Sequence, residues 1–106
     1  MIKTAGANVS PAEIEVQLHA YEPIKLARVI GVPDARRDEI AVLCVELKEG
    51  AIATEDDIKS FLRERIASYK VPTHVLFFAE DKIPMNGSGT KVQHERLLAV
   101  VQERLS

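Results

Sequence analysis

The stretch Ile24–Leu47, IKLARVIGVPDARRDEIAVLCVEL, gives the clearest indication of the fold of this chain. Apolar and β-branched residues roughly alternate over 24–32, and residues 40–47 are almost continuously apolar, which is typical of strands. Gly31-Val32-Pro33-Asp34 lies between them and has the composition of a turn. We therefore expect an antiparallel hairpin in which residues 40–47 form a central strand.

Apolar residues recur at helical spacing in three further segments, which predicts helices over 11–20, 55–68 and 93–104. If the first residues and Val75–Phe78 are also strands, the order of elements is β-α-β-β-α-β-loop-α. This order predicts an α+β fold. We expect a two-layer sandwich, with about three helices on one face of a small, mainly antiparallel sheet.

The first two predicted helices begin with capping residues. Ser10 is followed by Pro11, which suits the first helical position, and by Glu13, which is placed to complete a capping box. Thr54 is followed by three acidic residues, 55–57, which favour the positive end of a helix dipole. We interpret these acids as helix partners rather than catalysts.

The composition is that of an ordinary globular protein. A chain of 106 residues has room for one domain, since domains usually take about 100–200 residues. The net charge of −2, with no basic cluster interleaved with aromatic residues, argues against nucleic acid as a partner. The longest apolar run, Ile40–Val45, is far shorter than the roughly 20 residues of a membrane span. We expect a soluble, cytoplasmic protein, and a piece of a longer chain, because strand-like residues begin at Met1.

Metal and thiol chemistry find little support in the sequence. His19, His74 and His94 lie far apart and lack the spacing of a zinc site, so we predict no bound metal. Cys44 lies inside the most apolar predicted strand, where a cysteine behaves as a small hydrophobic residue.

Two glycine-containing loops are the candidate binding segments. In Asn86–Lys91, glycines would let backbone N–H groups approach an anion, but the Gly-x-x-x-x-Gly-Lys-Ser/Thr order of a Walker loop is absent. Lys91 is therefore either an anion-binding residue or a solvated loop lysine. The small residues of Lys3–Asn8 indicate either a tight hairpin or a passage for a thin ligand arm.

Four segments in order carry a more specific signal. They are residues 1–15, with a glycine loop before Pro-x-Glu-Ile-Glu; 29–34, followed by Glu39; 69–72, Tyr-Lys-Val-Pro; and 83–92, which looks like a closing Pro-x-x-x-x-Gly-Lys motif. Together they resemble the C-terminal domain of the adenylate-forming (AMP-binding) superfamily. This superfamily contains acyl-CoA synthetases, peptide-synthetase adenylation domains and luciferases. The resemblance covers essentially the whole chain, 1–106, and the opening is most like acyl-CoA synthetases.

Two positions depart from the family pattern. Thr90 separates Gly89 from Lys91, where the family usually has Gly directly before Lys. Asp38 precedes Glu39, where the family usually has Gly.

The resemblance implies a two-step ligase. A carboxylic acid, which we expect to be a fatty or other apolar acid, reacts with ATP to give an acyl-adenylate, and the thiol of CoA then displaces AMP. ATP, Mg²⁺ and CoA would act in the full-length enzyme, with none bound tightly by this domain alone. The nucleotide and acyl pockets would belong to an N-terminal AMP-binding domain that this chain lacks, so we expect the isolated chain to be inactive.

The resemblance also assigns residues to the two steps. Lys91, carried by the loop that contains Gly89, would stabilise charge during adenylation. After a rotation of the domain, Thr4, Ala5, Gly6 and Ala7 would line the channel for the pantetheine arm of CoA.

Two other interpretations stay open. The order of elements also suits a free-standing ferredoxin-like module that binds an effector or dimerises. The second open interpretation is a fragment of an adenylation domain that loads a carrier protein. An upstream reading frame for an AMP-binding domain would separate the module from the ligase domain.

Overall fold

The computed structural model of the chain describes residues 2–4, 7–79, 82–84 and 93–105. The elements are β1 (Ile2–Thr4), β2 (Ala7–Val9), α1 (Pro11–Leu18), β3 (Ile24–Asp34), β4 (Asp38–Leu47), α2 (Glu55–Arg63), a 3₁₀ helix η1 (Ser68–Lys70), β5 (His74–Phe78) and α3 (His94–Leu105). The sheet order is β2-β1-β4-β3, and β5 pairs with β4 as well. Among the described residues, no helix is long and apolar enough to cross a membrane.

Strand β4 is the centre of the sheet. Its residues from Ala41 to Glu46 are all buried, which is expected of a strand covered on both faces. Along one edge it pairs antiparallel with β3, and along the other it pairs with β1 and, in parallel, with β5. The prediction of residues 40–47 as a central strand is confirmed.

The β3–β4 hairpin is confirmed, but its turn lies further along the chain than predicted. Gly31–Asp34 pairs with β4, and the reversal occurs over 35–37. The Asp34 carboxylate accepts hydrogen bonds from the backbone N–H groups of Arg36 and Arg37, at 3.0 and 2.9 Å. This Asx-type turn lets Gly31–Asp34 stay extended, and Pro33 is tolerated because β3 is an edge strand.

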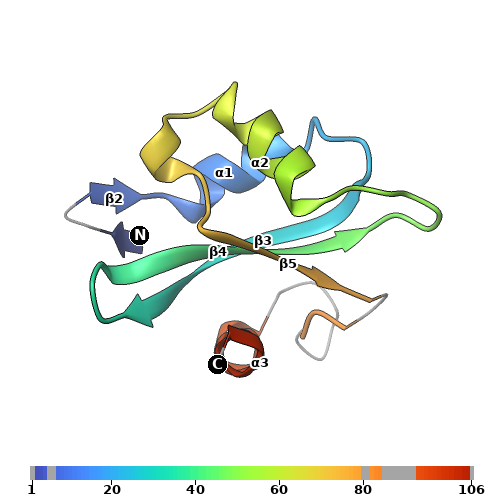
Figure 1. Cartoon of the computed structure of the whole chain (residues 1–106). Coiled ribbons are helices and arrows are strands. Elements are labelled where there is room, and N and C mark those ends of the chain that lie inside the picture. The colour runs from blue at the N-terminus through green and yellow to red at the C-terminus, as the bar shows by residue number, and fades with distance from the viewer. Residues whose placement is uncertain (1, 5–6, 80–81, 85–92, 106) are drawn as a thin grey trace.

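The helices cover both faces of the sheet (Figure 1). Helices α1 and α2 pack on one face, against Leu43 and Val45 of β4. Helix α3 packs on the other face, against Val42 and Cys44. The α+β class with a small, mainly antiparallel sheet and three helices is confirmed. The expectation that all helices share one face is wrong for α3, because the alternation of side chains along β4 leaves a second apolar face to cover.

Helix boundaries differ from those predicted, most of all for α2. Helix α2 ends at Arg63 rather than residue 68, because two consecutive N–H groups, of Arg65 and Ile66, donate to the same carbonyl of Leu62 and Ala67 is extended. The apolar spacing runs on across this break and predicted a longer helix. Helix α1 ends two residues before the predicted residue 20. Helix α3 begins and ends one residue later than the predicted 93–104.

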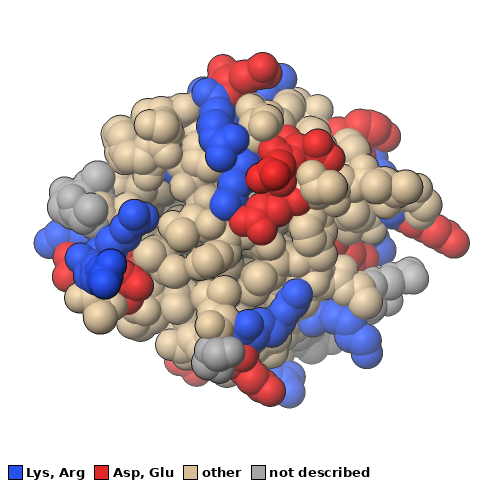
Figure 2. Space-filling model, in the orientation of Figure 1, with Lys and Arg blue, Asp and Glu red and all other residues tan. Residues whose placement is uncertain are grey.

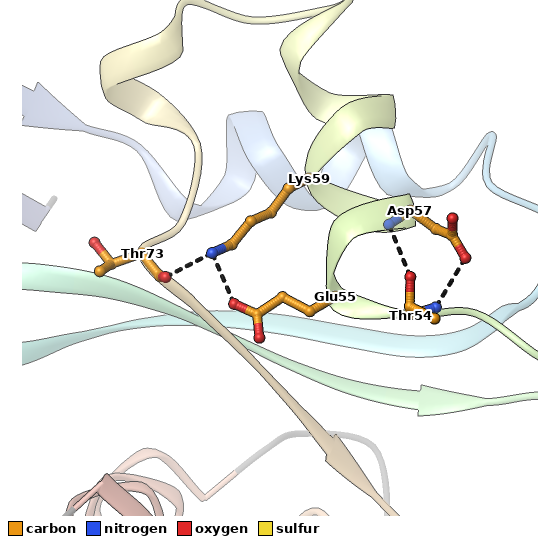
Figure 3. A network of polar contacts seen from close by, with 5 residues as sticks. All are labelled: Thr54, Glu55, Asp57, Lys59 and Thr73. Carbon is orange, nitrogen blue, oxygen red and sulfur yellow. Dashed lines mark hydrogen bonds and ion pairs between the residues drawn. The ribbon is translucent and has the colours of Figure 1, made fainter.

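The start of α2 is held by a capping box (Figure 3). The Thr54 hydroxyl accepts from the N–H of Asp57 at 3.1 Å, and the Asp57 carboxylate accepts from the N–H of Thr54 at 3.0 Å. In the same network the Lys59 ammonium contacts the Glu55 carboxylate at 2.7 Å and donates to the carbonyl of Thr73 at 2.8 Å. The hydrogen bond from Lys59 lowers the pKa of Glu55. Two of the three acids at this helix start thus have structural partners.

The start of α1 is built differently. Ser10 is the N-cap and Pro11 takes the first helical position, but the Ser10 side chain makes no capping hydrogen bond. Glu13 instead pairs with Lys70, at 2.7 Å. The predicted capping box of α1 is therefore wrong, because Lys70 is a partner that the local sequence does not contain.

The two helix starts provide a matched pair of substitutions. We expect Thr54→Ala to lower the free energy of unfolding by about 1 kcal/mol, since it removes the acceptor for an otherwise unpaired N–H. Ser10→Ala should change it by much less, because no capping bond is lost. Urea unfolding of both variants measures this, and an equal loss would contradict it.

Candidate functional site

The β1–β2 hairpin is rooted in the core that also holds α1 and α2. Ile2 and Val9 face each other across the hairpin and are 3% and 1% exposed. Lys3 and Asn8 point to solvent from the other side. One side of this short hairpin is thus fixed by apolar burial.

The predicted CoA-channel residues lie at the end of this hairpin. Thr4 closes β1 and pairs with Ala7, which opens β2. Ala5 and Gly6 lie between them and outside the described residues. The two strands form a hairpin, which brings Thr4 and Ala7 together.

Gly89 and Lys91 also lie outside the described residues. The residues that flank this segment are described: the N–H of Gln93 donates to the carbonyl of Pro84 at 2.9 Å. Ile83 is buried in the cluster that contains Leu97 of α3. The segment that carries Lys91 therefore leaves and rejoins the described structure at one place, on the α3 face of the sheet.

The two candidate segments are thus rooted on opposite faces of the sheet. The hairpin is rooted through Ile2 and Val9 in the core that holds α1 and α2. The other segment is rooted through Ile83 in the core under α3. Figure 1 shows the hairpin and α3 on different sides of the sheet.

Glu39 of β4 ties the hairpin to the sheet. Its Oε1 accepts a hydrogen bond from the backbone N–H of Lys3 at 3.0 Å. The sequence singles out Glu39 only as part of a family motif and does not reveal this contact. The contact joins residues 36 positions apart, so no local pattern could have revealed it.

Asp38, directly before Glu39, adopts a left-handed backbone with φ of 67°. The N–H of Glu39 donates to the carbonyl of Arg37 at 2.7 Å, which makes a tight three-residue turn around Asp38. A positive φ is the conformation that glycine adopts most readily, and Asp tolerates it better than most residues. Asp38 therefore takes a conformation that glycine, the residue expected here from the family motif, adopts without strain.

A surface groove of about 410 Å³ has Thr4 in its lining. It is lined by Thr4, Arg37, Ala41, Ser68, Tyr69, Val71 and Thr73. Arg37 supplies a positive charge to this lining, and Tyr69 is 58% exposed. A groove of this kind can hold a thin uncharged chain and place an anionic group near Arg37.

Charges elsewhere are mixed. On the face in Figure 2, acidic and basic side chains are interspersed, with acidic groups gathered over α2, whose first turn carries three acids. On this face no single sign of charge dominates.

Two further motif residues make contacts between distant segments. Lys70 of the Tyr-Lys-Val-Pro segment pairs with Glu13, and this hydrogen bond raises the pKa of Lys70. The Glu15 carboxylate accepts from the N–H of Val29, in edge strand β3, at 2.9 Å. These acids of the Pro-x-Glu-Ile-Glu motif therefore have structural partners.

Two further ionisable side chains, Cys44 and Glu46, are buried. Burial raises the pKa of Cys44 to about 12, so its thiol stays protonated. Glu46 is buried and contacts the Lys25 ammonium at 3.1 Å. Among the described residues, no three His, Cys, Asp or Glu side chains gather as metal ligands would.

Comparison with known proteins identifies the fold family. Residues 13–90 match the AMP-binding enzyme C-terminal domain. The chain belongs to this family. The resemblance inferred from the four sequence segments is confirmed.

Relatives of this C-terminal domain include acyl-CoA ligases. The chain is 37% identical over 105 residues to the mitochondrial medium-chain acyl-CoA ligase ACSF2 of Danio rerio, covering 99% of this chain and 17% of that protein. It is 39% identical over 95 residues to a feruloyl-CoA synthase of Amycolatopsis, covering 90% of this chain and 19% of that protein. The crystal structure of ATP-bound MatB from Rhodopseudomonas palustris matches with a TM-score of 0.89 at 31% identity, covering 100% of this chain and 20% of that one. The chain thus spans between 17% and 20% of these proteins.

The turn at Asp38 gives a direct test of the local backbone in this C-terminal domain. Asp38→Val should lower the free energy of unfolding by about 1–2 kcal/mol, because a β-branched residue is strained at positive φ. Asp38→Gly, which restores the usual family residue, should be at least as stable as the wild type. Thermal unfolding of the two variants measures the difference, and a Val variant as stable as the Gly variant would contradict the turn.

Proposed function

We propose that this chain is the mobile C-terminal domain of an ATP-dependent, AMP-forming acyl-CoA ligase, and that it works with an N-terminal AMP-binding domain. The carboxylate of the acid attacks the α-phosphate of ATP, and pyrophosphate leaves. The sulfur of CoA then attacks the acyl carbonyl of the adenylate, and AMP leaves with the electron pair of the broken bond. The observation that carries this proposal is the match of residues 13–90 to the AMP-binding enzyme C-terminal domain, together with the acyl-CoA ligases among the relatives.

Lys91 would serve the first step. As the carboxylate attacks, negative charge moves onto the α-phosphate oxygens and the leaving pyrophosphate, and an ammonium group placed beside the α-phosphate stabilises the transition state. Support comes from the closing sequence motif and from its flanks, Pro84 and Gln93, which are hydrogen-bonded to each other.

The hairpin would serve the second step. Residues Thr4, Ala5, Gly6 and Ala7 are small, so a pantetheine arm could pass close to their backbone. The groove that has Thr4 in its lining extends this passage, and Arg37 in the same lining suits an anionic part of CoA.

The hairpin and the Lys91 segment join the domain on opposite faces of the sheet, which bears on how the domain moves. Because of this placement, we propose that the domain rotates between the two steps and presents each segment to the adenylate in turn. The sheet built on β4 supplies the rigidity, because its central residues are buried on both faces.

The remaining parts of the reaction are assigned to the N-terminal domain. We assign Mg²⁺ to ATP bound on the N-terminal domain, because this ion binds readily to the phosphates of a nucleotide. The acyl pocket would lie there too, so the isolated chain should be inactive, and a fatty or other apolar acid is the proposed substrate. The proposed location is the cytoplasm.

The first test concerns Lys91 in the longer enzyme, meaning this chain joined to its N-terminal AMP-binding domain. Lys91→Ala should slow acyl-adenylate formation by about 10²–10³-fold, the usual loss for a transition-state charge donor, and should affect thioester formation from preformed adenylate far less. Pyrophosphate release and thioester formation are measured separately.

Lys82→Ala is the control for this test, because Lys82 is an exposed lysine that precedes the same segment. It should leave both half-reactions at the wild-type rate. An equal loss in both half-reactions for Lys91→Ala would instead indicate a folding or hinge role. Transfer of the acyl group to a carrier protein but not to CoA would contradict CoA as the acceptor. A gene with no upstream reading frame for an AMP-binding domain would favour the free-standing module.

The second test should give the reverse pattern. Gly6→Leu should spare pyrophosphate release and suppress thioester formation, since a branched side chain narrows the passage for the thiol arm. Thioester formation at the wild-type rate would show that this loop does not line the CoA channel.

Gly50→Leu is the control for backbone strain. Gly50 has a φ of 79° and nothing within 4 Å of an added Cβ, so the substitution strains a turn without narrowing a passage. It should lower the melting temperature without separating the two half-reactions. If Gly6→Leu behaves in the same way, Gly6 only maintains a turn.

A further inference from the structure

The hairpin that carries the proposed CoA loop has few described attachments to the rest of the sheet. Its β1 strand pairs with β4 at one described register position, Thr4 with Asp38. Ile2 and Val9 attach it through apolar burial, which is not directional. The bond from the N–H of Lys3 to Glu39 Oε1, at 3.0 Å, adds a directional polar attachment.

The space for this contact is created by Gly31 of β3. A Cβ on Gly31 would lie 2.7 Å from Glu39 Oε2 and 3.1 Å from Cγ1 of Ile2. The carboxylate and the Ile2 side chain therefore lie directly over the Gly31 backbone. A side chain at Gly31 would therefore require the Glu39 carboxylate to move and the Ile2 side chain to shift slightly.

The backbone before Glu39 is also unusual. The three-residue turn around Asp38 brings the N–H of Glu39 to the carbonyl of Arg37, at 2.7 Å. Asp38 is also the β4 residue that pairs with Thr4. The turn thus places the β4 partner of Thr4 next to the carboxylate that holds Lys3.

We propose that Glu39 is a positioning residue for the thioester step: its carboxylate fixes the hairpin 2–9 so that the loop at its end lines the path of the CoA thiol arm. A carboxylate that accepts from a backbone N–H makes a charge-assisted bond, which is stronger and shorter than a neutral one. Small displacements of a positioning element cost large factors in rate. Glu39 acts through the hairpin, and it is not assigned any contact with substrate. The inference rests on the proposed function.

The test uses Glu39→Ala and Glu39→Gln in the longer enzyme. Glu39→Ala should slow thioester formation from preformed adenylate, or raise the KM for CoA, by about tenfold, as expected for the loss of a charged hydrogen bond. It should leave pyrophosphate release within about twofold of wild type, because Ile83, which precedes the Lys91 segment, belongs to the core on the other face of the sheet. Glu39→Gln keeps an acceptor oxygen within reach of Lys3, and should recover most of the thioester rate.

Glu15→Ala is the matched control. Glu15 also accepts from a backbone N–H through its carboxylate, at 2.9 Å, but it attaches α1 to β3 rather than the hairpin to β4. It should affect stability without separating the half-reactions. If Glu39→Ala slows both half-reactions equally, or leaves the thioester step unchanged, Glu39 does not position the hairpin for CoA.

Hydrogen exchange separates this inference from the proposed function. In the longer enzyme, Glu39→Ala should speed exchange in the peptide 2–9 but not in the peptide 42–46, whereas Glu15→Ala should leave 2–9 unchanged. Unchanged exchange in 2–9 overturns the anchor, whatever the enzyme catalyses. If Glu39→Ala speeds exchange in 2–9 but the wild-type enzyme forms no acyl-adenylate, the anchor stands and the proposed function is overturned.

A second variant keeps the inference testable if Glu39→Ala does not fold. Lys3→Pro removes the same bond from its donor side, in an exposed strand position rather than in the central strand. The same selective loss of thioester formation is expected. Equal loss in both half-reactions would contradict the inference.

Discussion

Burial of β4 on both faces is the constraint on which the rest of this structure depends. Residues Ala41–Glu46 are continuously buried, so a shift of one residue in the pairing of β4 would exchange the side chains that face the two cores. The two faces need separate covers, which α1 and α2 provide on one side and α3 on the other. This division places the roots of the hairpin and of the Lys91 segment on opposite faces. The rigid strand between them lets one small domain carry two separate loops.

Three glutamates of the family motifs make contacts that join one motif segment to another. Glu13 pairs with Lys70, which joins the first motif to the third. Glu15 accepts from the N–H of Val29, which joins the first to the second, and Glu39 accepts from the N–H of Lys3, which joins the second back to the first. Each of these acids has a structural partner, so its presence in the motif does not require a catalytic role. The proposed chemistry is therefore left to the loops that the motif segments hold in place.

Features determined locally were predictable from the sequence, and features that depend on distant partners were not. The β3–β4 hairpin and the Thr54 cap follow from residues close in sequence, and both are confirmed. The apolar stripe of α3 showed that one side of the helix is buried, but not which face of the sheet it covers. The Glu39 anchor joins residues 36 positions apart, and local periodicity contains no information about it. The family resemblance assigned Thr4, Ala7 and Lys91 to the candidate site. Of these, the structure places Thr4 and Ala7 side by side, and Lys91 lies outside the described residues.

One domain that serves two steps must present different loops to the same adenylate. The most direct measurement is the distance from Lys91 Nζ to the adenylate phosphorus in structures of the longer enzyme, trapped with an acyl-adenylate analogue alone and with the analogue plus CoA. We expect Lys91 within hydrogen-bonding reach of the phosphate oxygens in the first complex. In the second, Lys91 should have moved away and the backbone of residues 4–7 should lie against the thiol arm. A lysine that keeps the same distance to the phosphate in both complexes would contradict rotation of the domain and the assignment of its two loops.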